Sequence, residues 1–164
     1  MAIWARIRNM SPGEVFQLFK VSIREPLFII PTLKATRESL KISSELYGDE
    51  HHENNRTNAF RHALWNYLIC EKCYKVSNSV EKSIEWSKKI TDLHEELAPN
   101  KKRAKIMDLH NNMIGRRIFE NFNSEENFDI IQVLTEEMRR AVKISTTEEI
   151  AGHKDRLVYI EERQ

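Results

Sequence analysis

The sequence predicts an all-α fold: a single-domain bundle of about six helices, with a short strand or an extended tail at its C-terminal end. Two observations favour this class. Only four glycines and four prolines occur in 164 residues, so long helices can run without interruption. Apolar residues also recur at helical spacing along most of the chain. The length fits one domain over residues 1–164, which buries enough surface to fold without disulfides or a structural metal.

Capping and breaking residues divide the chain into predicted helices. These cover the approximate ranges 11–26, 31–47, 57–75, 79–98, 102–122 and 125–144. Ser11–Glu14 form a capping box with proline at the first helical position, and Gly48 stops the second helix. Ser77–Ser79 and Asn123–Ser124 break the chain and cap the helices that follow. The β-prone stretch 156–160 is expected to form a short strand or an extended tail.

The polar segment 49–57 predicts a loop between the second and third helices. Its two histidines, His51 and His52, are metal-ligand types, but a polar loop favours plain exposure. Cys70 and Cys73 lie three residues apart on one face of the third helix, which is poor geometry for a disulfide. Because the chain has no second pair, a four-cysteine zinc site is excluded, and both cysteines are expected in or near a core.

Charge and hydropathy argue against several classes of protein. The 26 basic and 25 acidic residues nearly balance, so the sequence gives no strong nucleic-acid signal and is not a polybasic membrane binder. The apolar run 27–30 is far too short for a transmembrane segment. Residues 1–10 lack the apolar region of a signal peptide. The chain is therefore expected to be cytoplasmic when made, and any export would use a signal-peptide-independent secretion system.

The third predicted helix carries an unusual polar stripe. Asn58, Arg61, His62, Trp65 and Asn66 follow one another at i, i+3, i+4, i+7 and i+8, so they share one face. A solvated face would favour lysine and glutamate, and a core face would favour leucine and isoleucine. The stripe fits neither pattern and indicates a polar site inside the helix packing.

The fifth predicted helix repeats this pattern with Asp108, Asn111, Asn112, Gly115 and Arg116. Asparagine is a weak helix former, because its short amide competes for the backbone, so two in mid-helix lower stability unless their hydrogen bonds offset the cost. Gly115 costs about 1 kcal/mol relative to alanine in a helix interior. Glycine is useful there if a ligand or another backbone comes close.

Short connections make consecutive helices neighbours, so these stripes are expected to converge with the end of the fourth helix. The candidate catalytic residues are then His62, His94, Glu95 and Asp108. Imidazole and carboxylate groups bind zinc, manganese or iron, and the candidate ligands of such a divalent metal are His62, His94 and Asp108. Without metal, a histidine steered by a carboxylate is a general base. The residues expected to bind an anionic substrate are Asn58, Arg61, Trp65, Asn66, Asn111, Asn112 and Arg116.

A structural interpretation competes with this functional one. A single helical histidine is usually a core or surface residue, and a fully hydrogen-bonded polar network can fix helix packing without any chemistry. Three coordinated stripes favour a functional site over a purely structural network. The alternatives that stay open are a non-enzymatic interaction module and a binder of a small anion that performs no turnover.

The three stripes also carry motifs that resemble a known family. Residues 58–66 read NAFRHALWN, residues 94–95 read HE and residues 107–116 read MDLHNNMIGR. The pattern NAxRHAxWN, HE and MDLxNNxxGR resembles a bacterial helical family, domain of unknown function 6973. The resemblance covers about residues 57–118 and leaves residues 1–50 and 125–164 outside. It implies that the stripes matter but supplies no reaction. Members are often C-terminal domains of large secreted or toxin-like proteins.

A looser likeness, treated as analogy alone, is to the helical HD phosphohydrolases, which use histidine and aspartate around metal. Glu95 stands here where that motif has aspartate, and the spacing from His94 to Asp108 is short. The sequence as a whole favours a small bacterial hydrolase. Such an enzyme would act on a phosphodiester, a phospholipid ester or a cell-wall bond. An antibacterial effector of this kind would have a cognate immunity or inhibitor protein as its partner.

Overall fold

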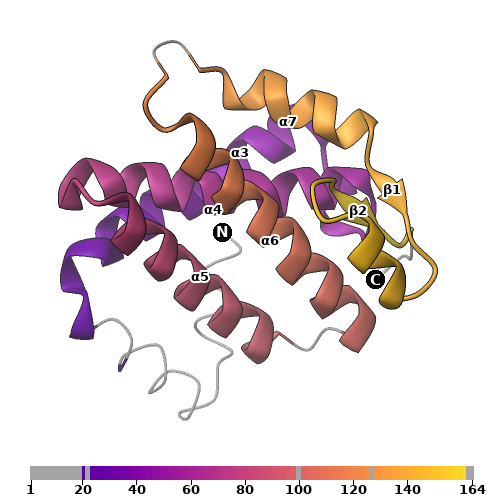
Figure 1. The fold of residues 1–164 in the computed structure, drawn as a ribbon, viewed down its shortest axis with the longest axis horizontal. Coiled ribbons are helices and arrows are strands. Elements are labelled where there is room, and N and C mark those ends of the chain that lie inside the picture. Colours follow the sequence, from indigo (N-terminus) through magenta and orange to yellow (C-terminus); the bar gives the residue numbers. More distant parts are fainter. Residues whose placement is uncertain (1–19, 21–22, 99–100, 126–127, 162–164) are drawn as a thin grey trace.

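The part of the chain that the computed structural model describes comprises residues 20, 23–98, 101–125 and 128–161. Long α-helices dominate this part, and a two-stranded sheet lies near its C-terminal end (Figure 1). With η for a 3-10 turn, the elements are η1 (Pro26–Phe28), α3 (Ile29–Tyr47), η2 (Glu50–His52), α4 (Arg56–Ser77), α5 (Val80–Leu97), α6 (Lys102–Phe122), α7 (Ile130–Arg139), β1 (Val142–Lys143), η3 (Glu148–Gly152) and β2 (Val158–Tyr159). The predicted all-α class and the short C-terminal strand are confirmed. The capping box at Ser11–Glu14 lies outside the described residues.

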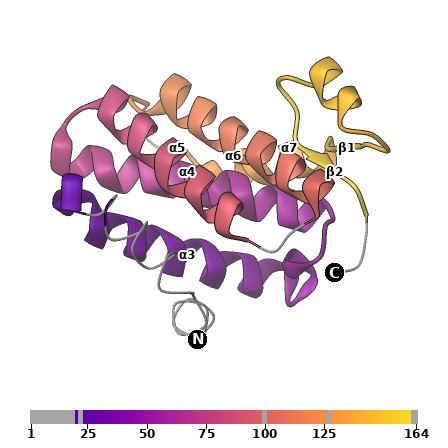
Figure 2. The ribbon, with the colours of Figure 1, turned by 90° about the horizontal axis from the view of Figure 1, so that it is seen from below.

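Helix α4 is the centre of the bundle, because α3, α5, α6 and α7 all pack against it. Figure 2 shows α3 along one side of α4 and the pair α5 and α6 along the other. α4 buries side chains around its whole circumference, and Phe60, Leu64 and Ile69 are among the largest fully buried ones. The polar stripe predicted on this helix therefore lies mostly against protein rather than solvent.

Local residue chemistry sets most helix ends close to their predicted positions. Helix α3 ends where Gly48 adopts φ 58°, a conformation that favours glycine. The side-chain oxygen of Asn55 caps α4 by accepting two backbone N–H groups of its first turn. At the other end of α4, Asn78 has φ 51°, and Ser79 then caps α5.

The last helix is shorter than predicted. The sequence predicted it over 125–144, with its cap at Ser124, but α7 spans Ile130–Arg139. Asp129 is the true cap, since its carboxylate accepts the first N–H groups of the helix. The predicted C-terminal part fails because the segment 142–144, with β-branched Val142 and Ile144, leaves the helix and pairs with a distant strand.

The strands β1 and β2 form a parallel pair beside α6 (Figure 1). Val142 lies opposite Val158, and Lys143 lies opposite Tyr159. The backbone N–H groups of Val142 and Ile144 donate to carbonyl oxygens of the β2 segment, each at 2.9 Å. The C-terminal stretch is thus tied to the helices rather than extended into solvent.

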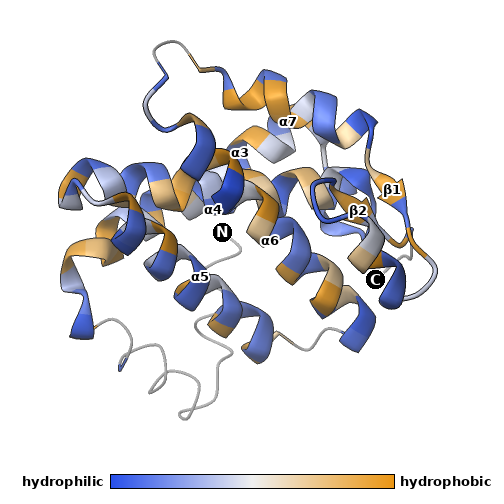
Figure 3. Ribbon diagram, viewed as in Figure 1, coloured by the Kyte–Doolittle hydropathy of each residue, from blue (hydrophilic) through white to orange (hydrophobic). Residues whose placement is uncertain are grey.

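Polar and apolar residues alternate along the outer helices. Figure 3 shows hydrophilic and hydrophobic bands alternating along α5 and α6, the pattern of helices that turn one face to a core. None of the described helices is both long enough and apolar enough to cross a membrane, which agrees with the sequence prediction of no transmembrane segment.

Candidate functional site

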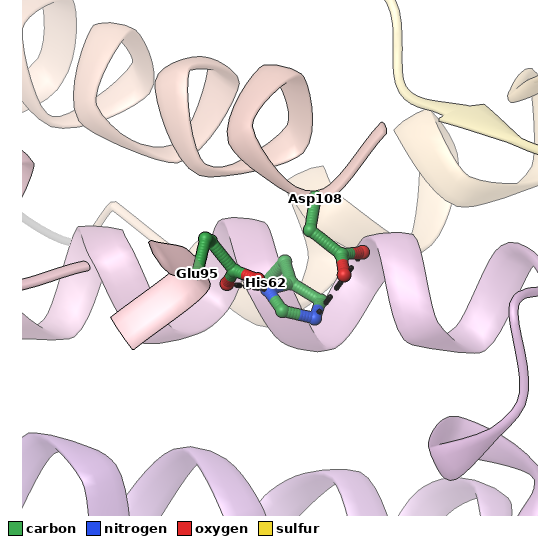
Figure 4. Close-up of side chains that lie close together, drawn as sticks. All are labelled: His62, Glu95 and Asp108. Atoms are coloured by element: carbon green, nitrogen blue, oxygen red, sulfur yellow. Dashed lines mark ion pairs between the residues drawn. The ribbon is translucent and has the colours of Figure 1, made fainter. Parts of the chain in front are cut away.

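Three ionisable side chains from three helices meet inside the bundle. His62 comes from α4, Glu95 from the end of α5 and Asp108 from the start of α6, and they are 5%, 1% and 1% exposed. One potential metal-ligating atom from each lies within 4.8 Å of the other two. Figure 4 shows the imidazole between the two carboxylates. The predicted convergence of three stripes thus brings these three candidates together.

The two carboxylates face opposite nitrogens of the imidazole ring. The Nδ1 atom of His62 lies 3.6 Å from Oε1 of Glu95, and Nε2 lies 3.4 Å from Oδ1 of Asp108. A third charged group approaches the ring, because Nη2 of Arg61 lies 3.0 Å from His62 Nε2. The cluster therefore contains one guanidinium, one imidazole and two carboxyl groups.

Burial controls the protonation of this cluster. Burial, the Arg61 guanidinium and the His94 ring hold the pKa of His62 well below its usual value of 6.5. Burial and the negative charge of Glu95 raise the pKa of Asp108 well above its usual 3.8, although Arg61 opposes this. Burial therefore favours the uncharged forms of His62 and Asp108 in the metal-free chain.

Asparagine side chains hold His62 in place. Asn112 Oδ1 lies 3.1 Å from His62 Nδ1 and accepts a 2.7 Å hydrogen bond from Asn66 Nδ2. The amide nitrogen of Asn112 also donates to Glu95 Oε1, at 3.4 Å. These amides are completely buried. Their contacts offset the helix-propensity cost that their mid-helix positions imply.

Arg116 is connected to the His62 ring through Asn66 and Asn112. Its Nη1 atom donates to Asn66 Oδ1 at 2.7 Å and to Thr91 Oγ1 at 3.3 Å. Ser87 Oγ and Thr91 Oγ1 also donate to the same Asn66 oxygen. The sequence predicted Arg116 as a substrate-binding residue, whereas these contacts place it in a buried polar network behind His62.

Two aromatic candidates border the cluster. His94 and Trp65 are half-buried and meet edge to face, with ring centroids 5.0 Å apart. Trp65 Nε1 donates to Thr36 Oγ1 of α3 at 2.9 Å. His94 was predicted as a metal ligand, but the close-lying ligand group among the described residues consists of His62, Glu95 and Asp108. The charge of His94 nevertheless acts on His62.

The remaining predicted substrate-binding amides lie apart from the ring. Asn111 turns to the C-terminal strand, where its amide nitrogen donates to Val158 O at 2.9 Å and its oxygen accepts the Val158 N–H at 3.0 Å. Asn58 donates to His51 O at 3.4 Å, and its own Oδ1 is buried with no hydrogen-bond partner among the described residues. Asn111 is therefore a clamp for β2.

Sequence reasoning missed His51. It was predicted to be exposed in a loop, but it is 0% exposed, because the η2 turn folds it back onto α3. Its Nε2 lies 3.0 Å from Ser44 Oγ, and its ring lies 3.9 Å from that of His52. Burial, His52 and Arg61 lower the pKa of His51 to about 4. Only the conformation of the turn reveals this, and no local sequence signal encodes it.

Comparison with known proteins assigns the chain to a family without a known activity. Residues 19–142 match the family described as a domain of unknown function (DUF6973). Neither the curated proteins nor the solved structures gave a match to the chain. The resemblance read from the sequence was too narrow at 57–118, because the matched region also includes α3 and α7. With more than half of its residues matched, the chain belongs to the DUF6973 domain family.

Proposed function

We propose that the chain is a hydrolase in which the His62, Glu95 and Asp108 cluster holds a divalent metal ion that activates water. The observation that supports this most directly is the approach of three ligand atoms, from three separate helices, to within 4.8 Å of one another in a buried setting. Bringing two carboxyl groups together away from water is unfavourable unless a cation or a proton compensates them. A divalent ion provides that compensation.

The donor set fits zinc, manganese or iron. Carboxylate oxygens are hard ligands, and an imidazole nitrogen is a ligand of intermediate hardness. Three protein ligands leave coordination positions on the ion open for water. An ion held by these residues would lower the pKa of its bound water to about 7, which would supply a nucleophile at neutral pH. The Asn112 oxygen on His62 Nδ1 is the kind of outer partner that orients a ligating histidine.

Arg61 suggests the substrate class. Its guanidinium now lies on His62 Nε2, and that nitrogen has one lone pair, so we expect Arg61 to leave the ring when an ion binds there. A guanidinium beside the ion would then bind an anionic group of the substrate in bidentate fashion. This favours phosphorus chemistry, on a phosphodiester or a phospholipid ester, over a cell-wall bond.

A second candidate is a non-enzymatic interaction module whose polar network only specifies helix packing. The observation that favours it is the same Arg61 contact, together with the saturated hydrogen bonds of Asn66 and Asn112. A network of this kind stabilises one packing arrangement without any ligand. Under this alternative, changing His62 lowers stability and removes no separate activity.

Metal binding separates the two candidates. The full chain, stripped with a chelator, is titrated with zinc, manganese and ferrous ions by calorimetry, and bound metal is counted by elemental analysis. We expect one ion per chain, bound more tightly as the pH rises, because the ligands must be deprotonated to hold it. Asp108→Asn and His62→Gln should abolish binding. His110→Gln is the matched control, because His110 lies on α6 but contacts the Arg156 carbonyl instead. Binding that survives Asp108→Asn would overturn the proposed site.

Hydrolysis is then tested with the metal-loaded chain on an activated phosphodiester, phospholipid vesicles and peptidoglycan. We expect turnover of a phosphorus ester that disappears in His62→Gln while the circular dichroism spectrum is retained. The effector role and its immunity partner are tested by expression in bacteria, where the wild type should slow growth and His62→Ala should not. A folded His62→Ala variant that is equally toxic contradicts the effector proposal.

A further inference from the structure

We propose that a relay of two amides, Asn66 and Asn112, anchored by Arg116, sets the tautomer of His62, with the proton on Nδ1 and the lone pair on Nε2. The inference uses a simple property of the side chains involved. A guanidinium can only donate hydrogen bonds, whereas an amide has one donating end and one accepting end. A chain of such contacts that begins at an arginine therefore has a single direction.

The first step fixes Asn66. Arg116 Nη1 lies 2.7 Å from the Asn66 side chain, so the atom it meets must be the oxygen. The hydroxyl groups of Ser87 and Thr91 lie 3.0 Å and 3.1 Å from the same atom and also donate to it. The other end of the Asn66 amide is therefore the nitrogen, and it can only donate.

The second step carries this direction to the imidazole. Asn66 Nδ2 lies 2.7 Å from the Asn112 side chain, so that atom must be the Asn112 oxygen. The same oxygen lies 3.1 Å from His62 Nδ1 and can only accept, so Nδ1 must carry the hydrogen. Glu95 agrees, because its Oε1 accepts from the Asn112 nitrogen and also lies 3.6 Å from His62 Nδ1.

A second and independent constraint acts on the opposite nitrogen. Arg61 Nη2 lies 3.0 Å from His62 Nε2 and can only donate, so Nε2 must accept. Both constraints give the same neutral tautomer. The Nε2 lone pair then lies on the side of the ring that faces Asp108.

The two arginines differ in what they do next. Under the proposed function, Arg61 leaves Nε2 when an ion binds. The amide relay then keeps the proton on Nδ1, because Arg116 and the His62 carbonyl orient Asn66, and Glu95 orients Asn112. This consequence rests on the proposed function, whereas the tautomer itself does not. Arg116 is thus a positioning residue that anchors Asn66 from a position that is only 7% exposed.

Nitrogen NMR measures the tautomer directly. The metal-free chain is labelled with ¹⁵N-histidine, and long-range proton–nitrogen spectra are recorded at mildly alkaline pH. The chain has six histidines, and His62→Gln identifies the signals of His62. We expect a protonated Nδ1 and an unprotonated Nε2 in the wild type. A wild-type His62 protonated on Nε2 overturns the proposal without any further variant.

The relay is isolated in the absence of the second constraint. Arg61→Met should keep the Nδ1-protonated form, because the amide relay still acts. Adding Asn112→Ala should produce a mixture of both tautomers, because Nδ1 then loses the amide oxygen that accepts from it, while a carboxyl group still lies near each ring nitrogen. Adding Arg116→Met instead should keep the single tautomer, because the His62 carbonyl still orients Asn66 and Glu95 still orients Asn112. If Arg61→Met alone shifts the proton to Nε2, there is no relay, and this result stands even if the double variants do not fold.

A metal titration then separates failure of the relay from failure of the proposed function. Asn112→Ala should weaken metal binding by about 10–100-fold, the usual effect of losing an outer partner of a ligating histidine. Arg117→Met, at an exposed position of the same helix, should leave it unchanged. A chain with the expected tautomer that binds no metal contradicts the function and keeps the relay. Metal binding that is unchanged by Asn112→Ala contradicts the consequence drawn for the relay.

Discussion

His51 and His62 are both buried imidazoles, and in each the neutral form is favoured by burial and by the nearby Arg61 charge. They differ in their partners. His62 lies between two carboxyl groups, whereas His51 meets a serine hydroxyl and the ring of His52. A histidine that stays neutral in the folded chain but takes a proton when unfolded makes stability depend on pH.

For His51 the sign of this dependence is clear. The unfolded residue binds a proton near pH 6.5, and the folded one only near pH 4, so the unfolded state binds more protons between these values. The free energy of unfolding should therefore fall as the pH falls from about 6.5 to about 4. His51→Gln should make this fall shallower, as urea unfolding at a series of pH values will show.

Asp108 acts with the opposite sign, because its raised pKa means that the folded chain keeps a proton that the unfolded chain loses as the pH rises. Comparing His51→Gln with the wild type cancels this contribution, because Asp108 is present in both. If the free energy of unfolding fell equally with pH in the wild type and in His51→Gln, the assignment of the acid sensitivity to His51 would be contradicted.

Spacing along a helix predicted much of the site but not its detail. The stripes correctly brought His62 and Asp108 together, since helical periodicity fixes which residues share a face. Periodicity could not separate Asn111 from Asn112. Asn112 holds the imidazole of His62, whereas Asn111 holds β2. Which of the two faces His62 depends on the rotation of α6 about its axis.

At the scale of elements, the crossing of α4 and α6 sets that rotation. A Cβ atom at Gly115 would lie 2.0 Å from the backbone oxygen of Ala63, so the two helices meet with no room for a side chain. The sequence left open whether a ligand or another backbone comes close to Gly115, and the structure places the Ala63 backbone there. His62 precedes Ala63 directly, so this contact also sets how close the imidazole comes to α6.

Gly115→Ala should therefore destabilise the fold. Alanine gains about 1 kcal/mol of helix propensity over glycine, but the clash is with rigid backbone, so the helices must separate. We expect a net loss of about 1–3 kcal/mol in the free energy of unfolding, measured with urea. Gly152→Ala is the control, because no atom lies within 4 Å of its added Cβ. Equal stability of the two variants would mean that the crossing is loose.

Helix boundaries show what local signals leave undecided. Ser124 and Asp129 are both good capping residues, and the sequence alone favoured the wrong one. At the other end, Val142 leaves the helical pattern because its partner Val158 lies sixteen positions further along the chain. Such distant pairing is absent from any local window, so the predicted range 125–144 was too long.

At the scale of the whole molecule, the C-terminal segment closes the bundle. The sheet uses the carbonyl oxygens of Leu157 and Tyr159, whereas the polar groups of Val158 between them meet Asn111 of α6. Glu161 also donates its backbone N–H to Asn54 O, next to the cap of α4. The segment therefore links helices that are distant in sequence.

Asn111→Ala tests this closure. It leaves the N–H and the carbonyl of a buried strand residue without their partner, and an unsatisfied buried group costs about 1–3 kcal/mol. We expect a loss of that size in the free energy of unfolding and faster hydrogen exchange at the Val158 amide. Arg117→Ala is the matched control, since Arg117 also contacts this segment but is exposed, where such pairs contribute little. Unchanged exchange at Val158 would show that Asn111 is not the clamp.

The clamp that Asn111 forms on Val158 has a practical consequence for the design of recombinant fragments. The family match stops at residue 142, and a fragment trimmed to that boundary looks complete on paper. Such a fragment would nevertheless lack the backbone of Val158, which bonds to Asn111. Asn111 lies on α6, the helix that also carries Asp108. Expression clones that keep the chain through residue 161 preserve this contact, and with it the alignment of the helices around His62.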